Sequence, residues 1–230
     1  MHKRGERRAV LIVLAALGAY MVSQGVLTSE RLWFLAAVVP SIILHEVSHG
    51  AVARIFGDDT AQKAGRLTLN PISHIDLFGT LLMPTMLVLA GVTPIAFAKP
   101  VPVNVSKLRS PRNQSFLVSA AGPATNIVLA LIAALGMKLL RPDGTLFEFF
   151  LSFGFVNALL ATFNLLPIPP LDGSAFLERV LPRSMWPGYL KVRRYSMPLL
   201  IVIVLWIPGV FASIYEPVLR VWARLAGLTY

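Results

Sequence analysis

Two histidines, His45 and His49, lie within an apolar run from 32 to 56, and Glu46 directly follows the first of them. On an α-helix, residues four positions apart lie on the same face, about 40° from eclipsed at roughly 3.6 residues per turn. Both imidazoles can therefore bind one Zn²⁺ ion, with the Glu46 carboxylate beside a water molecule at that ion. Ionisable groups within a membrane span are costly and usually functional, so the pattern predicts a metal site at membrane depth.

The composition is that of a polytopic membrane protein. Hydrophobic residues make up 56% of the 230 residues and charged residues only 14%, whereas soluble domains average about 45–50% apolar residues. The net charge of +10 comes from Lys and Arg residues that cluster between apolar runs. That arrangement follows the positive-inside rule, so we expect a lipid bilayer as partner and no nucleic acid. The chain has no cysteine, which leaves His, Asp, Glu or water as metal ligands.

The order of basic and apolar segments predicts an all-α fold with five to six transmembrane helices. The run 9–27 follows a basic tail and indicates an uncleaved signal-anchor with its N-terminus in the cytoplasm. The run 32–56 then returns inward. His45 lies about 13 residues into that run, or roughly 20 Å into a core about 30 Å thick. The active site is therefore expected near the cytoplasmic side of the cell membrane.

The apolar stretch 77–98 has Lys and Arg residues beyond both of its ends, so both ends are expected in the cytoplasm. A full crossing would place the basic residues that follow it outside, whereas a re-entrant hairpin keeps them inside. We favour the hairpin. The stretch from 215 onward is either a sixth crossing or an interfacial helix. Three other runs are expected to cross: 116–140, 146–166 and 197–214.

The third metal ligand is expected where the run 146–166 ends, because three prolines occupy four positions at 167–170. Proline breaks the helix and removes backbone donors, so Asp172 lies on irregular chain at the depth deduced for the histidines. A catalytic zinc commonly has three protein ligands and one open position, which Asp172 would complete. The alternative is a plain turn, since Asp-Gly is a common turn dipeptide. The matched depth and the missing ligand favour the metal.

The chain resembles the site-2 protease family of intramembrane zinc metalloproteases, in its short branch without a PDZ or CBS domain. The resemblance implies that His45, His49 and Asp172 bind zinc, that Glu46 is the catalytic base and that Asn164 holds the substrate backbone. It implies a zinc-dependent endopeptidase that cleaves membrane proteins in or near their transmembrane segments. The motifs that carry it are HEVSHG at 45–50, LTLNPISHID at 67–76, AKPVPVN at 98–104, AGPATN at 121–126 and NLLPIPPLDG at 164–173.

We expect one membrane-embedded protease domain over 1–230, with a catalytic core at about 32–173 and peripheral helices at 9–27 and 197–230. Two segments, 66–70 and 101–105, alternate polar or proline residues with apolar ones. They are predicted to be short β-strands on the cytoplasmic side that an unwound transmembrane substrate can join. The alternative is that both are loops.

Other polar residues receive plainer interpretations. For His74, a hydrogen bond within its own loop is favoured over a role in stabilising charge near the site. For Asn126, close helix packing is favoured over a role as a site residue.

Two other functions remain open at this point. A transporter or a membrane metal-binding protein would also place His and Asp at membrane depth, but the chain holds no second copy of either motif. A catalytically silent relative would keep the ligands, yet Glu46 is intact.

Overall fold

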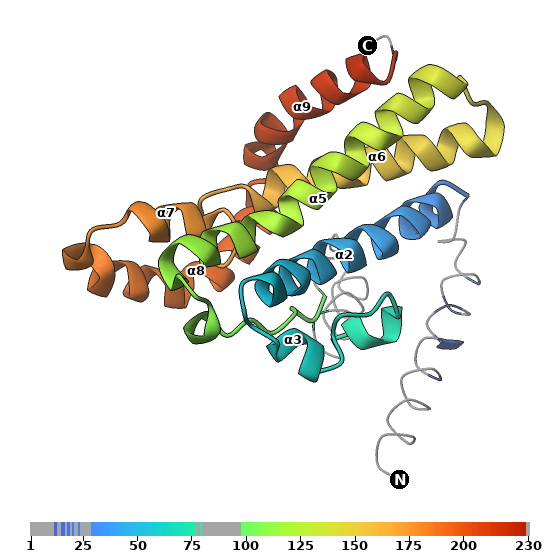
Figure 1. Cartoon of the computed structure of the whole chain (residues 1–230). Helices are drawn as coiled ribbons and strands as arrows, with labels where there is room; N and C mark the ends of the chain where they lie inside the picture. The colour runs from blue at the N-terminus through green and yellow to red at the C-terminus, as the bar shows by residue number, and fades with distance from the viewer. Residues whose placement is uncertain are drawn as a thin grey trace.

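The structure, a computed structural model, describes residues 29–76 and 98–228, together with Gly79 and six single residues between 12 and 23. Three long helices pack against one another: α2 (Ser29–Ile55), α5 (Pro111–Leu140) and α6 (Gly144–Asn164) (Figure 1). Within the described ranges, they are the helices long and apolar enough to cross a membrane. Their bounds lie within five residues of the predicted runs. The longer start of α5 comes from Pro111, whose fixed φ and missing N–H suit a first helical position.

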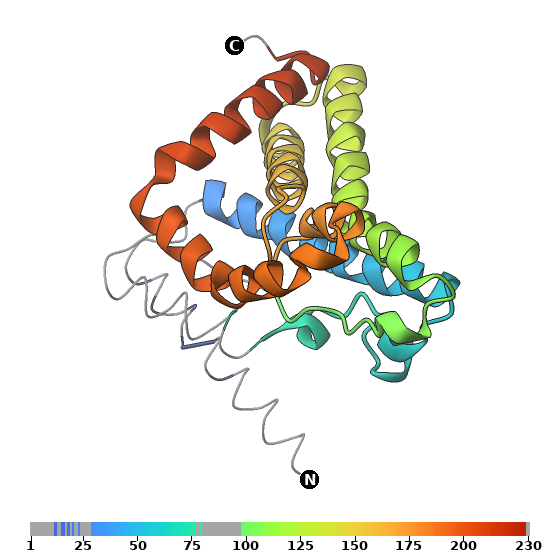
Figure 2. The ribbon, with the colours of Figure 1, turned by 90° about the vertical axis from the view of Figure 1, so that its left-hand side faces the viewer.

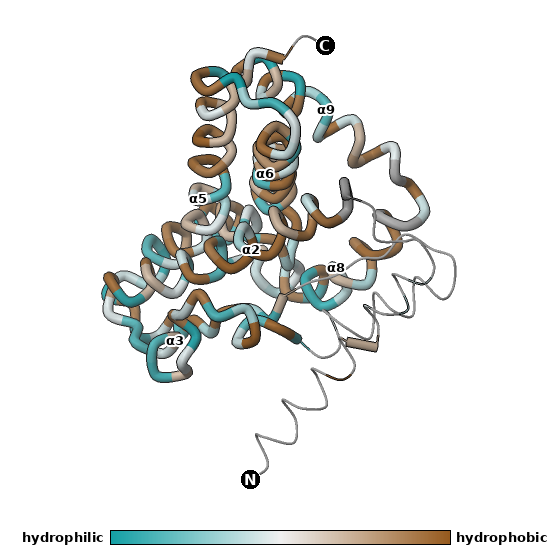
Figure 3. Tube along the Cα trace, turned by 90° about the vertical axis from the view of Figure 1, so that its right-hand side faces the viewer, coloured by the Kyte–Doolittle hydropathy of each residue, from teal (hydrophilic) through white to brown (hydrophobic). Residues whose placement is uncertain are grey.

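Small side chains fill the interior of the helix bundle, and large apolar ones face outward. Membrane helices gain no hydrophobic free energy from meeting each other, so close packing depends on small residues. The outer face of α5 exposes Leu131, Ile132 and Leu135, and hydrophobic residues cover α5 and α6 over most of their length (Figure 3). Lipid is the natural partner of this face. The buried cluster between α5, α6 and α9 is rich in alanine: Ala130, Ala133, Ala134, Ala158, Ala223 and Ala226.

The chain after α6 is irregular over residues 165–173 and continues into α7 (Ser174–Val180) and the short η4 (Arg183–Met185). Two longer helices follow, α8 (Trp186–Trp206) and α9 (Pro208–Leu225), which meet at a bend (Figure 2). The expected crossing at 197–214 is therefore not one continuous helix. Pro208 supplies no N–H to continue α8, and Ile207 before it has left the helical conformation, with φ −131°.

Helix α9 is fastened to the bundle by one aromatic side chain. Trp222 Nε1 donates a hydrogen bond of 2.8 Å to the Ala130 carbonyl on α5. Its ring also lies against Gly154 on α6, where an added Cβ would come within 1.9 Å of the ring. A residue larger than glycine at 154 would therefore push α9 away from the bundle.

The segments between α2 and α5 are short helical turns and loops: α3 (Thr60–Lys63), η1 (Pro71–His74) and η3 (Val105–Lys107). The structure has no β-strand in its described ranges, so the predicted strands at 66–70 and 101–105 are wrong. Side chains occupy the backbone groups that a strand ladder would need. In the first segment, Thr68 Oγ1 accepts from Asn70 N. In the second, Glu46 Oε2 accepts from Val101 N and Asp58 Oδ2 accepts from Asn104 N.

Two predictions fall on residues that the structure does not describe. The signal-anchor helix at 9–27 and the hairpin at 77–98 lie almost entirely outside the described ranges.

Candidate metal centre

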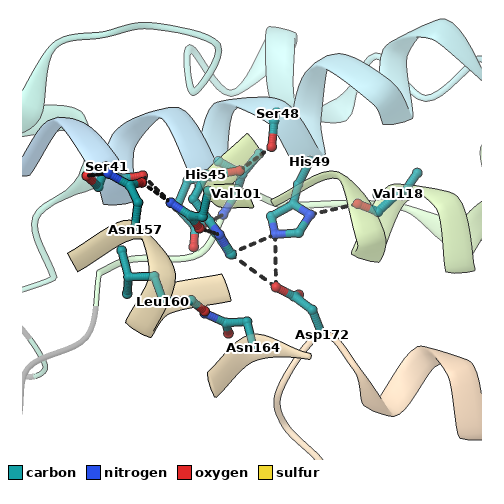
Figure 4. Close-up of polar contacts among 12 residues, drawn as sticks. Ser41, His45, Ser48, His49, Val101, Val118, Asn157, Leu160, Asn164 and Asp172 are labelled. Atoms are coloured by element: carbon teal, nitrogen blue, oxygen red, sulfur yellow. Dashed lines mark hydrogen bonds and ion pairs between the residues drawn. The ribbon is translucent and has the colours of Figure 1, made fainter. Parts of the chain in front are cut away.

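The three predicted metal ligands converge on one point between α2 and the irregular segment 165–173 (Figure 4). Asp172 Oδ2 lies 3.1 Å from His45 Nε2 and 3.3 Å from His49 Nε2. The two Nε2 atoms are 3.1 Å apart. The helical spacing of the histidines and the proline break before the aspartate therefore bring together the set of side chains expected from the sequence.

The second nitrogen of each histidine ring faces a hydrogen-bond acceptor. His49 Nδ1 lies 2.7 Å from the Val118 carbonyl, which has no hydrogen to give, so Nδ1 is the donor. His45 Nδ1 lies 2.6 Å from Asn126 Oδ1. In the neutral rings, a proton on Nδ1 leaves a lone pair on Nε2. Both lone pairs then point toward Asp172.

These residues fit a divalent metal such as zinc. Asp172 Oδ2 is buried and has no hydrogen-bond partner in the described part of the chain. Three electron pairs that meet at about 3 Å repel one another unless a cation lies between them. Gly122 on α5 leaves the space open, because an added Cβ would come within 2.4 Å of His49 Nε2 and 2.6 Å of His45 Nε2. Two imidazoles and one carboxylate are a ligand set typical of catalytic zinc.

Glu46 lies next to this set on α2, and a loop holds its carboxylate. Oε2 accepts a 2.8 Å hydrogen bond from the backbone N–H of Val101. The loop is fixed in turn by the buried Arg66, which donates to the Lys99 carbonyl at 2.5 Å. The buried Asp58 also holds it, through a 2.6 Å bond from Asn104 N. One oxygen of Glu46 is thus held by the main chain.

Behind His45, a set of fully buried polar side chains joins three helices. Asn126 Nδ2 donates to Asn157 Oδ1 at 2.7 Å and lies 3.4 Å from the backbone carbonyl of Ser41. Asn157 Nδ2 donates at 2.8 Å to both Ser41 Oγ and the Phe153 carbonyl. The sequence favoured packing over a site role for Asn126, and it gave no prediction for Asn157 or Ser41. The available signal was their polarity inside apolar helices.

Asn164, the predicted substrate-binding residue, lies in the last turn of α6 beside the site (Figure 4). Its Nδ2 donates to the Leu160 carbonyl at 3.0 Å, which uses one of its two amide hydrogens. Its backbone carbonyl accepts from Gly173 N at 2.6 Å, which draws the segment that carries Asp172 back against the end of α6.

His74 stands apart from the centre. Its Nε2 lies within its own loop, 2.8 Å from the Thr68 carbonyl. The expected loop hydrogen bond is therefore confirmed, and the ring must donate because a carbonyl only accepts.

An apolar cavity of about 340 Å³ adjoins the centre on the side of α5. Asp172 forms part of its wall. The cavity is large enough for one or two side chains of a bound peptide. The apolar side chains around it are Phe116, Ala120, Pro123, Leu165, Pro167 and Phe176.

Comparison with known proteins gives one consistent result. The family model of peptidase family M50 matches residues 33–142 and 141–207, a range that contains the whole centre. YwhC of Bacillus subtilis is 37% identical over 213 residues, which cover 81% of this chain and 94% of the relative. Rip2 of Mycolicibacterium smegmatis is 31% identical over 184 residues, with 79% and 70% covered. A protein of Methanocaldococcus jannaschii is 33% identical over 145 residues, with 63% and 68% covered.

The names of all three relatives describe them as candidate zinc metalloproteases. No solved structure matches the chain significantly.

Proposed function

The chain belongs to peptidase family M50, and from that premise we propose that His45, His49 and Asp172 hold a catalytic zinc ion while Glu46 acts as the catalytic base. The protein is a zinc metalloprotease of the site-2 protease type, built from membrane-spanning helices. The observation that carries the assignment of residues is the convergence of two Nε2 atoms and one carboxylate oxygen, with Glu46 next to His45 in the chain. A transporter or metal carrier is not favoured, because neither explains a carboxylate held beside the ligand set.

The roles of the residues follow from their positions. When bound, zinc acts as a Lewis acid toward the scissile carbonyl and lowers the pKa of water at the site. Val101 N–H holds one oxygen of Glu46, so the other oxygen takes the proton from the attacking water and later gives it to the leaving amine. Asp172 and the two histidines keep their ligand atoms within 4.8 Å of one another.

The family implies membrane-protein substrates in a lipid environment. A transmembrane substrate is helical, and its peptide groups are occupied until the helix unwinds locally. We assign Asn164 to hold the freed backbone, since a primary amide offers both a donor and an acceptor. Its position beside Asp172 supports this role (Figure 4).

The proposed arrangement in the membrane has five to six spans in one domain over 1–230, with a re-entrant hairpin at 77–98. The N-terminus and the active site lie toward the cytoplasm, and the membrane is the cell membrane. Two basic segments, the loop before α5 and the chain after α6, support this arrangement. Arg112 at the start of α5 donates to the Arg179 carbonyl on α7 at 2.9 Å, so the loops before α5 and after α6 meet at one end of the bundle. The α5–α6 turn lies at the opposite end (Figure 1).

Cysteine labelling tests the arrangement, because the natural chain has no cysteine. Single cysteines at positions 63, 107 and 191 should all react with a reagent confined to the cytoplasmic side. Labelling of position 107 only from outside would make 77–98 a full crossing.

Cleavage of a single-span model substrate by the purified protein tests the function. Activity should disappear with a zinc chelator and return with zinc. Asp172→Ala should lose zinc and activity together. Asp59→Ala should keep both, because it removes an exposed carboxylate that pairs only with Lys63 and Lys107 in the described part of the chain. Full zinc occupancy in Asp172→Ala would place the third ligand elsewhere.

A further inference from the structure

Four side chains form a continuous line through the interior of the bundle: His45, Asn126, Asn157 and Ser41. They come from α2, α5 and α6, and the last three are fully buried. Buried amides in a membrane bundle are costly unless each polar atom finds a partner. Here each amide has its partners, at 2.6 to 2.8 Å along the line.

The direction of every bond in this line is fixed by backbone carbonyls, which only accept. Ser41 Oγ donates to the Ala37 carbonyl at 2.7 Å, so it accepts from Asn157. Asn157 Nδ2 also faces the Phe153 carbonyl at 2.8 Å, so the nitrogen of this amide, and not its oxygen, lies on that side. Its oxygen therefore faces Asn126 and accepts from it.

The same reasoning fixes Asn126. Its Nδ2 lies between Asn157 Oδ1 and the backbone carbonyl of Ser41, two groups that accept. Its Oδ1 must then face His45, where it accepts the Nδ1 hydrogen at 2.6 Å. An amide turned the other way would set acceptor against acceptor and donor against donor.

We infer that Asn126, Asn157 and Ser41 are positioning residues that hold the His45 ring in the one tautomer and orientation in which Nε2 binds the metal. The inference rests on the proposed function. A proton fixed on Nδ1 leaves the Nε2 lone pair toward Asp172, and a hydrogen bond to Nδ1 makes the imidazole a stronger ligand. None of the three residues belongs to the group of ligand atoms that meets at the centre.

A purely structural role would make different predictions. Polar side chains between membrane helices can simply join the helices. In that role, any change that breaks the hydrogen bonds lowers stability, and zinc binding falls only as far as the fold is lost. In the positioning role, zinc binding depends most on whether residue 126 still accepts the Nδ1 hydrogen of His45, and less on the residues further along the line.

The test compares Asn126→Leu with Asn126→Asp by chelator competition for zinc in the purified full-length protein. Leucine removes the acceptor, and loss of an outer partner of a metal-binding histidine typically lowers metal affinity by about 10- to 100-fold. Aspartate keeps the acceptor toward His45 and loses only the donors toward Asn157 and Ser41, so its zinc affinity should lie well above that of Asn126→Leu. Equal or weaker zinc binding by Asn126→Asp would overturn the inference.

Two further readouts separate positioning from folding. The double variant Asn126→Leu/Asn157→Leu should bind zinc no more weakly than Asn126→Leu, since the line is already broken at His45.

Visible absorption of the Co²⁺-substituted protein should shift in Asn126→Leu and stay unchanged in Thr162→Val. Thr162 donates to the Ala158 carbonyl on α6, so this control loses a part-buried hydrogen bond that does not belong to the line. Additive losses in zinc affinity, or an unshifted Co²⁺ spectrum, would contradict positioning.

Ser41→Ala keeps the test decisive if Asn126→Leu yields little folded protein. It removes one hydroxyl and leaves both amides, and should weaken zinc binding by less than about tenfold, yet more than Thr162→Val does. Zinc affinity equal to that of the control would overturn the inference. His45→Ala serves as the reference: if it retains zinc, the ligand assignment itself fails, whereas zinc lost in His45→Ala but kept in Asn126→Leu refutes only the positioning role.

Discussion

The candidate centre has a helical half and a loop half, and the two are built differently. His45, Glu46 and His49 project from α2, and the two histidine side chains are only 8% and 10% exposed. Asp172 comes from an irregular segment and is 22% exposed. The histidines each have a hydrogen-bond partner on the ring nitrogen away from the centre. The loop half borders the apolar cavity.

The loop half is nevertheless tightly held by its backbone. Gly173 N donates to the Asn164 carbonyl, and an added Cβ at Gly173 would come within 2.3 Å of the Leu165 carbonyl. Val101 N–H reaches Glu46 in the same way, by main chain and not by side chain. The comparison teaches that the helical ligands are held at their ring nitrogens, by a side-chain acceptor for His45 and a backbone acceptor for His49, whereas the loops make their contacts through their own backbone N–H groups.

The largest expected effect comes from Glu46→Gln, in which the helical half keeps its geometry and loses its base. Glutamine can still accept the Val101 N–H but cannot take a proton, so kcat should fall by about 10²- to 10⁴-fold while zinc content stays near that of the natural protein. Parallel kinetics and metal analysis check this. Zinc lost in step with activity would mean that Glu46 is a ligand.

Gly122→Ala should break the helical half from the side of α5. The new methyl would meet both Nε2 atoms, at 2.4 and 2.6 Å, so the imidazoles must move and zinc affinity should fall by more than the roughly 10- to 100-fold expected for an outer partner.

Gly136→Ala on the same helix is the matched control. There the Cβ would lie 2.6 Å from the Phe150 ring, far from the centre, so stability should fall while zinc is retained. Equal zinc loss in both variants would mean that the effect of Gly122→Ala is general unfolding.

The helical half was also the half that sequence predicted best. The period of an α-helix places His45, Glu46 and His49 together without further information, and the apolar runs give α2, α5 and α6 within five residues. Asn157 and Ser41 could not be paired with His45 from sequence. Hydrogen bonds across helices depend on how each helix is rotated about its axis, which an apolar run of low amphipathicity does not specify.

In the loop half, sequence predicted the ligand but not its surroundings. The prolines before Asp172 indicated irregular chain at the depth of the histidines. Because a catalytic zinc commonly has three protein ligands, Asp172 was the expected third. The contact between Val101 and Glu46 could not be predicted from the sequence, because a backbone N–H makes it and every residue except proline has one. The alternation at 66–70 suggested a strand, yet Asn70 caps a turn there. Local hydrogen bonds from side chains to the backbone replaced the hydrogen bonds that a strand would have formed.

Asn164→Leu probes the loop half where we expect the substrate to bind. Leucine keeps the volume but removes the donor and acceptor, so freed substrate amides stay unpaired at about 1–3 kcal/mol each, or roughly a five- to 150-fold loss in cleavage. Zinc content and fold should be retained. Substrates that already carry Gly or Pro near the scissile bond should be cleaved with a smaller defect. The same proportional defect on helix-stable and helix-broken substrates would remove Asn164 from this role.

The smallest effect is expected from Asp58→Asn, which loosens the loop that carries Val101. Burial raises the pKa of Asp58, but hydrogen bonds from Thr60 and Asn104 outweigh it, so the pKa is lowered overall. A lowered pKa means that Asp58 stabilises the fold above the unfolded value of about 3.9 and that this stability is lost as the pH falls through the folded value.

Asparagine at position 58 would turn an N–H group toward the N–H of Thr60 or Asn104, yet Arg66 would still hold the loop through the Lys99 carbonyl. Cleavage at neutral pH should therefore fall by less than about tenfold, equivalent to roughly 1.4 kcal/mol, with zinc unchanged. Asp59→Asn is the control. Lys63 and Lys107 lower the pKa of Asp59 to about 2, but its exposed ion pairs do not reach the loop backbone, so cleavage should not change. A loss in Asp58→Asn as large as that in Glu46→Gln would show that the loop backbone, and not α2, sets the position of the base.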